Sequence, residues 1–180
     1  MISLSTEIDG ACWRLLIFLS SPPGGIDEEE FNAWIPSPAA LAGMETGYRR
    51  TMGIMDTTSF GALALLRLGR TDDAVELARL ILEPGQKTVR KTTTLLCHTV
   101  LGQVAAGRGQ TEEADSHFSR ALEEASLSRL PMLELLAARD WKRYALEPQG
   151  RDSSEAEAVI DGACLKMKKT RTQLEPVLLV

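Results

Sequence analysis

The sequence has few cysteines and no excess of positive charge. Its three cysteines, Cys12, Cys97 and Cys164, are odd in number and far apart, which fits a reducing intracellular compartment such as the cytoplasm or an organelle interior. A formal net charge of −5 argues against a nucleic-acid footprint over the whole chain. With 44% hydrophobic and 25% charged residues, the 180-residue chain has the composition of one ordered domain or a compact array of repeats.

Long hydrophobic runs are also absent. The strongest apolar segment, 11–19, is interrupted by Arg14 and has about half of the roughly 20 residues that cross a bilayer. Acidic residues rather than cations precede it, so we predict neither a signal peptide nor a transmembrane helix. Within this segment, apolar side chains, among them Trp13 and Phe18, would lie on almost every side of a helix. This pattern predicts a helix that is buried on several sides. This helix packs inside the fold, against another chain or in a membrane interface.

Sequence motifs for catalysis and cofactor binding are missing as well. Cys97 and His98 point about 100° apart on a helix, so they cannot share a metal, and the ligand spacing of a zinc site is absent. The segment 85–88 resembles a phosphate loop but has Gln86 where a glycine must precede the lysine. We therefore predict no cofactor, no metal and no catalytic residue. An enzyme in an unrecognised helical fold is kept only as an alternative to a non-enzymatic protein.

A repeat runs through the chain. Gly69, Gly109 and Gly150 each precede a short polar and acidic segment that ends in alanine, at spacings of 40 and 41 residues, and a fainter copy begins at Gly25. Glycine ends a helix by adopting a positive φ, and Thr or Asp can then cap the next helix. Acids after the cap suit the positive helix N-terminus. Each copy therefore predicts a turn between two helices.

Apolar residues at helical spacing flank these turns. After the second turn they recur at Ala114, Phe118, Ala121 and Ala125. The alternating runs and hairpin turns typical of strands are nearly absent. The sequence therefore predicts an all-α fold, with helices near 7–19, 27–35, 39–50, 54–68, 72–83, 88–107, 112–127, 131–146 and 153–169.

The second copy carries a family resemblance. Leu101-Gly102, followed by Gly109, Ala114, Phe118 and Ala121, resembles the tetratricopeptide-repeat (TPR) pattern, in which these residues allow close helix packing. The period exceeds the usual length of about 34 residues. It is similar to the long-helix variants of kinesin light chains and bacterial signalling regulators. The resemblance is specific over 90–156, weaker back to 54 and absent before 50. It implies a right-handed superhelical array of antiparallel helix pairs, a TPR-like α-solenoid.

In such an array the first helix of each pair is expected to line the concave side. Aligning the turns places Ser59, Thr99 and Asp140 in one row, and Leu63, Gln103 and Tyr144 in another. None of the six is the Lys, Arg or Asn with which the chaperone-binding branch of the family holds a C-terminal carboxylate. A groove that combines polar and apolar side chains favours an extended or helical peptide with few charges as its ligand. Alternatively, residues 1–50 of the chain itself fill the groove.

A basic cluster lies near the end of the chain. Lys166, Lys168, Lys169 and Arg171 lie at and just after the C-terminus of the helix predicted near 153–169, where cations complement the negative helix end. The alternative is a docking patch for an acidic partner or an anionic membrane surface. The apolar segment 176–180 is expected to pack within the chain or on a neighbour.

We therefore expect three parts. Residues 1–50 form an N-terminal helical segment or degenerate capping repeat, 51–170 form three TPR-like helix pairs, and 171–180 form an apolar tail. The leading hypothesis is a non-enzymatic interaction or scaffold module that holds another protein or peptide in its groove or on its apolar N-terminal helix. The alternative is an accessory structural subunit of a larger complex. Peripheral membrane association stays open, and no nucleic-acid partner is expected.

Overall fold

The computed structural model describes Glu29 and residues 52–82 and 91–174. These residues form helices and turns and contain no strand, which confirms the all-α prediction for this part of the chain. Apart from Glu29, the predicted helices near 7–19, 27–35 and 39–50 lie outside the described residues. None of the described helices is both long and apolar enough to cross a membrane.

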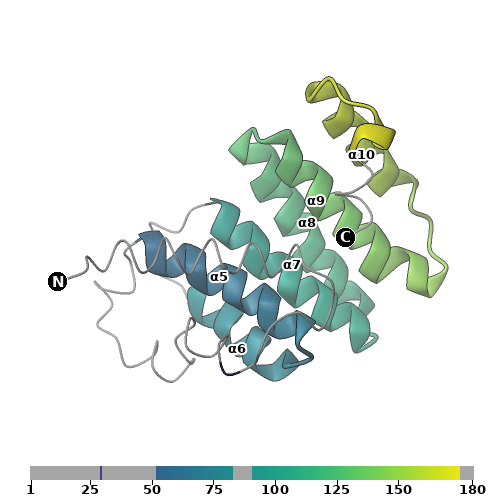
Figure 1. The fold of residues 1–180 in the computed structure, drawn as a ribbon. Coiled ribbons are helices and arrows are strands. Elements are labelled where there is room, and N and C mark those ends of the chain that lie inside the picture. Colours follow the sequence, from purple (N-terminus) through teal and green to yellow (C-terminus); the bar gives the residue numbers. More distant parts are fainter. Residues whose placement is uncertain (1–28, 30–51, 83–90, 175–180) are drawn as a thin grey trace. The chain divides into compact units, whose positions relative to one another are not determined.

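The helices follow one another along the chain as Figure 1 shows. Their bounds are α5 Met52–Arg67, α6 Thr71–Ile81, α7 Lys91–Gly107, α8 Thr111–Ser128, α9 Pro131–Trp141, the π-helix η1 Lys142–Leu146, the 3-10 helix η2 Glu147–Gln149 and α10 Ser154–Lys166. The chain divides into two compact units, 1–100 and 101–180, and the boundary lies within α7. The sequence predicted one helix over 131–146, whereas the α-helix ends at Trp141.

The three glycine turns share one geometry. Gly69, Gly109 and Gly150 have φ angles of +77°, +74° and +63°, as the sequence predicted. At each turn the next backbone N–H donates to the carbonyl five residues earlier, which closes the helix end in a Schellman motif. These bonds run from Arg70 to Leu65 at 2.9 Å, from Gln110 to Ala105 at 2.9 Å and from Arg151 to Leu146 at 3.0 Å.

The threonine caps predicted after two of these turns are absent. Arg70 and Gln110 occupy the N-cap positions of α6 and α8, and neither makes a side-chain cap hydrogen bond. The Thr111 hydroxyl instead donates to Oε1 of Gln149 at 3.2 Å. Acids still occupy the first turns of both helices, where they complement the helix dipole.

In the first unit, α5 packs against α6. The buried face of α6 carries Ala74, Val75, Leu77, Ala78 and Ile81. These positions recur every three or four residues, so one stripe of the helix is removed from water. The alanines in it permit a close approach of the two helices.

In the second unit, α9 packs against both α8 and α10. Phe118 on α8 is fully buried and belongs to a core cluster with Trp141, Ala145, Leu146 and Ala156. A second cluster contains Leu135, Ala138, Ile160, Ala163, Cys164 and Leu174. Leu122 packs against both clusters, so the unit has a continuous apolar interior.

Candidate functional site

A partly buried polar contact joins two of the residues predicted to line the concave side. Gln103 on α7 donates from Nε2 to Oδ2 of Asp140 on α9 at 3.3 Å. The other carboxylate oxygen of Asp140 accepts from Nε and Nη2 of Arg139 at 2.7 and 2.6 Å. Asp140 is buried, and an unpaired carboxylate there would be costly. The contacts therefore fix both carboxylate oxygens.

The other predicted groove residues are divided between the two units. Ser59 and Leu63 lie on α5 and Thr99 lies on α7, all in the first unit; Leu63 is half-buried and the two hydroxyl residues are buried. Among the buried side-chain atoms of the described residues, Thr99 Oγ1 lacks a hydrogen-bond partner. Tyr144 belongs to the second unit and is 38% exposed, with the Arg143 guanidinium carbon 5.6 Å from its ring centre. The exposed face of η1 thus carries both an aromatic ring and a cation.

The π-helix η1 continues α9 between two anchored residues. Trp141 precedes it, is buried and donates from Nε1 to Oδ1 of Asp115 at 3.1 Å. Leu146 ends it and is buried in the same apolar cluster. π-Helical segments are rare and frequently occur at functional sites because they turn side chains away from the ordinary helical positions. In this π-helical turn, the side chains of Arg143 and Tyr144 are exposed to solvent.

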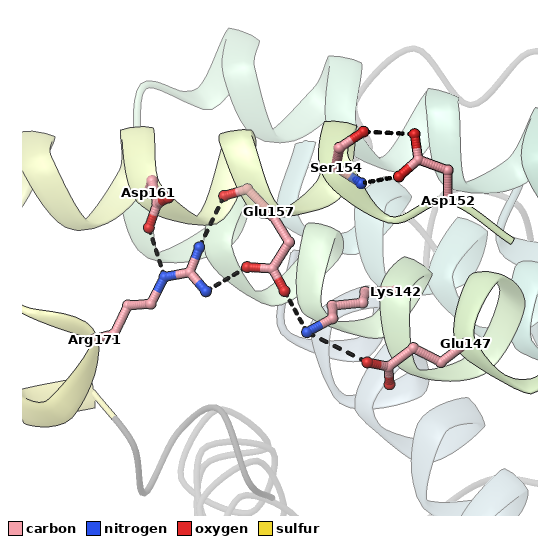
Figure 2. Close-up of polar contacts among 7 residues, drawn as sticks. All are labelled: Lys142, Glu147, Asp152, Ser154, Glu157, Asp161 and Arg171. Atoms are coloured by element: carbon pink, nitrogen blue, oxygen red, sulfur yellow. Dashed lines mark hydrogen bonds and ion pairs between the residues drawn. The ribbon is translucent and has the colours of Figure 1, made fainter. Parts of the chain in front are cut away.

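A chain of ion pairs of alternating sign crosses from η2 to α10 and then to the residues that follow α10 (Figure 2). Lys142 Nζ lies 3.3 Å from Oε1 of Glu147 and also pairs with Glu157. Arg171 pairs with Glu157 through Nη1 and with Asp161 through Nε, the latter at 2.5 Å. Glu157 is the centre of this chain, because it binds one cation from each side.

These pairs shift the pKa values of the groups that form them. The hydrogen bond from Lys142, aided by Arg171, lowers the pKa of Glu157 although burial acts against it. The hydrogen bond to Glu157 in turn raises the pKa of Lys142. The hydrogen bond with Asp161 is the main cause of the raised pKa of Arg171. All three groups are therefore held in their charged forms at neutral pH.

A pocket of about 410 Å³ opens beside this chain. Its wall is mainly charged and consists of Arg139, Lys142, Arg143, Glu147, Glu157, Ile160 and Arg171. The wall holds four cations and two carboxylates, and two of the cations are also paired with Asp140 and Asp161 outside the wall. The pocket therefore presents hydrogen-bonding groups of both signs without a large excess of either, which suits a polar group of low net charge.

The lysines of the basic cluster near the end of α10 differ in their contacts: one forms an ion pair and two are exposed to solvent. Lys166 lies 2.6 Å from Oε2 of Glu134 and links the end of α10 to the first turns of α9. Lys168 and Lys169 are exposed and follow the helix end. Trp13 and Phe18, the other predicted docking residues, lie outside the described residues. Lys166 therefore has a structural contact, whereas its two neighbours face solvent.

The cysteine and histidine pair considered in the sequence lies in the interior. Cys97 and His98 are buried on α7. Burial raises the pKa of the Cys97 thiol, so the sulfur is protonated at neutral pH and is a weak nucleophile. Within the described ranges, no group of three His, Cys, Asp or Glu side chains is placed to hold a metal ion.

Sequence reasoning missed the pocket. Arg139, Lys142 and Arg143 have the i, i+3, i+4 spacing that places cations on one face of a helix, and this signal was available. The participation of Glu157 and Arg171 had no such local signal, because they lie after the next turn and come together only when α10 packs on α9.

Comparison with protein-family models, with the curated proteins and with the solved structures finds no match for this chain.

Proposed function

We propose that the protein is a non-enzymatic interaction module built from TPR-like helix pairs. The observation that carries this proposal is the recurrence of one helix-closing turn at Gly69, Gly109 and Gly150, at spacings of 40 and 41 residues. A turn repeated at a constant period is typical of arrays in which each helix pair packs on the next.

A close contact between two helices of the repeat supports the same proposal. A Cβ atom added to Gly102 would lie 2.9 Å from the ring of Phe118, so α7 approaches α8 more closely than any other residue at position 102 would allow. These two residues belong to the pattern that resembles the TPR family. They therefore have a packing role that accounts for their identity.

The ligand we propose is an extended or helical peptide of low net charge. In the second unit the proposed contacts are the exposed Tyr144 and the half-buried Gln103, and in the first unit the half-buried Leu63. Ser59, Thr99 and Asp140 are buried, so the structure does not offer them as direct contacts. The pocket beside α9 is lined by other residues of the same unit, and its wall adds donors and acceptors that can pair with peptide groups of both kinds. A strongly acidic or basic peptide would meet like charges in the same wall.

A peptide selection on the full-length chain tests this function. Peptides selected from a random displayed library are expected to be low in net charge, and their binding, measured by calorimetry, is expected to weaken about tenfold or more in Tyr144→Ala. Ser119→Ala on the exposed part of α8 is the matched control and is expected to bind like the wild type. Equal affinity of the Tyr144 variant for every selected peptide would reject the proposed surface, and a selection without binders would reject the function.

The second candidate is an accessory structural subunit of a larger complex. The apolar segments 11–19 and 176–180 favour it, because such segments are costly to leave in water. Sedimentation of the purified chain over a concentration series separates the two candidates. A monomer at all concentrations favours the free-standing module, and concentration-dependent association favours the subunit.

A further inference from the structure

Two helix ends in the second unit have an unusual backbone. Arg129 after α8 and Lys168 after α10 have φ angles of +56° and +54°, and they are the positive-φ residues other than glycine in the described part of the chain. A left-handed conformation is unfavourable for a residue with a side chain and is ordinarily given to glycine or asparagine. A cation therefore occupies two positions where glycine would be easier to accommodate.

Both turns lie at the same end of the helices. Because α9 runs antiparallel to α8 and to α10, its beginning is next to the ends of both. The Lys166–Glu134 pair connects α10 to α9 at this end, and Met132 and Met167 pack against one apolar cluster there. Figure 1 shows the α8–α9 turn and the end of α10 on the same side of this unit.

Leucine side chains project into solvent beside the two cations. Leu127 is 54% exposed and Leu130 is 51% exposed, on either side of Arg129. Leu165 is 80% exposed, three residues before Lys168. A leucine this accessible contributes little to the folded core, and each of the three is free to enter another apolar environment.

Cations outnumber acids at this end, where Glu134 is paired with Lys166. Neither 125–133 nor 162–174 contains an acidic residue. Arg129, Lys168 and Lys169 are exposed and make no ion pair within the described residues. We name the six residues Leu127, Arg129, Leu130, Leu165, Lys168 and Lys169 the basic leucine end.

We propose that the basic leucine end binds the surface of a membrane that contains anionic lipids. Exposed leucines can enter the boundary between head groups and acyl chains, while Lys and Arg next to them contact lipid phosphates. The six residues of the basic leucine end are far fewer than the roughly 20–30 residues that each partner contributes to a stable protein interface. A lipid surface accepts each side chain separately, so it fits this arrangement better than an acidic protein does.

This surface is distinct from the proposed peptide groove, and the proposal does not rest on that function. The whole chain carries a formal charge of −5, so its general field repels an anionic membrane. Binding therefore depends on the local cations and is expected to weaken as salt screens them.

Co-sedimentation of the full chain with vesicles tests the proposal. The wild-type chain is expected to bind vesicles containing about one third phosphatidylserine at least about tenfold more tightly than pure phosphatidylcholine vesicles. The double variant Arg129→Gly/Lys168→Gly is expected to lose about tenfold or more of this affinity. Glycine suits both backbone conformations, so the variant keeps or gains thermal stability, which separates lost binding from lost folding.

The control variant Lys91→Gln/Arg120→Gln removes two exposed positive charges elsewhere and is expected to bind nearly as the wild type does. A third variant, Leu127→Ser/Leu165→Ser, is expected to weaken binding while keeping the salt dependence.

Three results would overturn the proposal: no binding of the wild type, equal binding to the two kinds of vesicle, or full binding by the glycine double variant. Binding to polyglutamate without binding to vesicles would instead indicate an acidic protein partner.

Discussion

At the scale of single residues, the protein uses glycine for two different reasons. Gly69, Gly109 and Gly150 provide a positive φ at helix ends. Gly102 lies inside α7 and allows close packing of α7 on α8, because the ring of Phe118 occupies the space that a side chain at position 102 would need. A substitution at Gly102 therefore tests helix packing without changing a turn.

Gly102→Ala is expected to destabilise the protein by about 1–3 kcal/mol. The new methyl group would lie 2.9 Å from two ring carbons of Phe118, and this buried ring has no space to move into without displacing its neighbours. Urea unfolding followed by circular dichroism measures the change.

The matched control is Gly162→Ala in the interior of α10. A Cβ atom there meets no atom within 4 Å, so the variant is expected to be stabilised by up to about 1 kcal/mol through helix propensity. Equal effects of the two substitutions would show that the contact with Phe118 is unimportant.

At the scale of elements, one carboxylate connects α8 to the residues on both sides of the third turn. Asp115 accepts from Trp141 at the end of α9 and forms a two-bond pair with Arg151 after Gly150, at 3.1 and 2.7 Å. Burial tends to raise the pKa of Asp115, but the bonds from Arg151 and Trp141 outweigh it and lower the pKa. The aspartate is therefore charged when it holds these elements together.

Asp115→Asn is expected to destabilise the fold by about 1–3 kcal/mol, because it removes the charge that pairs with Arg151 and one acceptor oxygen. Thermal unfolding measures the loss. Glu113→Gln, an exposed position in the first turn of the same helix, makes the same charge change and is expected to have a much smaller effect. Similar losses in the two variants would contradict the role given to Asp115.

The ion pairs of Glu157 predict a particular response to acid. Its pKa is lowered in the folded protein, so the unfolded chain binds more protons as the pH falls past the usual glutamate range near 4.3. The stabilisation is complete above the unfolded pKa and is lost as the pH falls through the folded pKa. Glu157→Gln should therefore reduce the slope of unfolding free energy against pH below about pH 5.

Urea unfolding at a series of pH values measures this slope. Part of the dependence remains in the variant, because Asp115, Asp152 and Asp161 also have lowered pKa values. Glu155→Gln, exposed on the same helix, is the control and should leave the slope close to that of the wild type. An unchanged slope in Glu157→Gln would contradict the ion-pair account.

At the scale of the whole molecule, net charge is expected to oppose association between copies at neutral pH. The chain has a formal net charge of −5 at pH 7 and a sequence pI near 5.2. Net charge of one sign keeps protein molecules apart, and this repulsion disappears near the pI. Light scattering against pH is therefore expected to show a maximum of association close to pH 5.2. A scattering profile that is flat between pH 4 and pH 7 would contradict this prediction.

The sequence predicted several local features of the fold correctly. Helices near 54–68, 72–83 and 112–127 match α5, α6 and α8 to within two residues at each end, and the three turn glycines have the predicted positive φ. The helix expected over 131–146 changes to a π-helix at Lys142. Threonine capping failed at α6 and α8, because the helix begins at the threonine itself in both cases.

Helix positions and turns follow from the sequence because apolar spacing and the φ preference of glycine act over only a few residues. Two features had no local signature: the contact of Gln103 with Asp140, and the central place of Glu157 between Lys142 and Arg171. They depend on residues far apart in the chain that meet only when the helices pack. The sequence by itself thus determined the helices and the turns between them, and the tertiary structure decided which charged side chains meet and which remain in solvent.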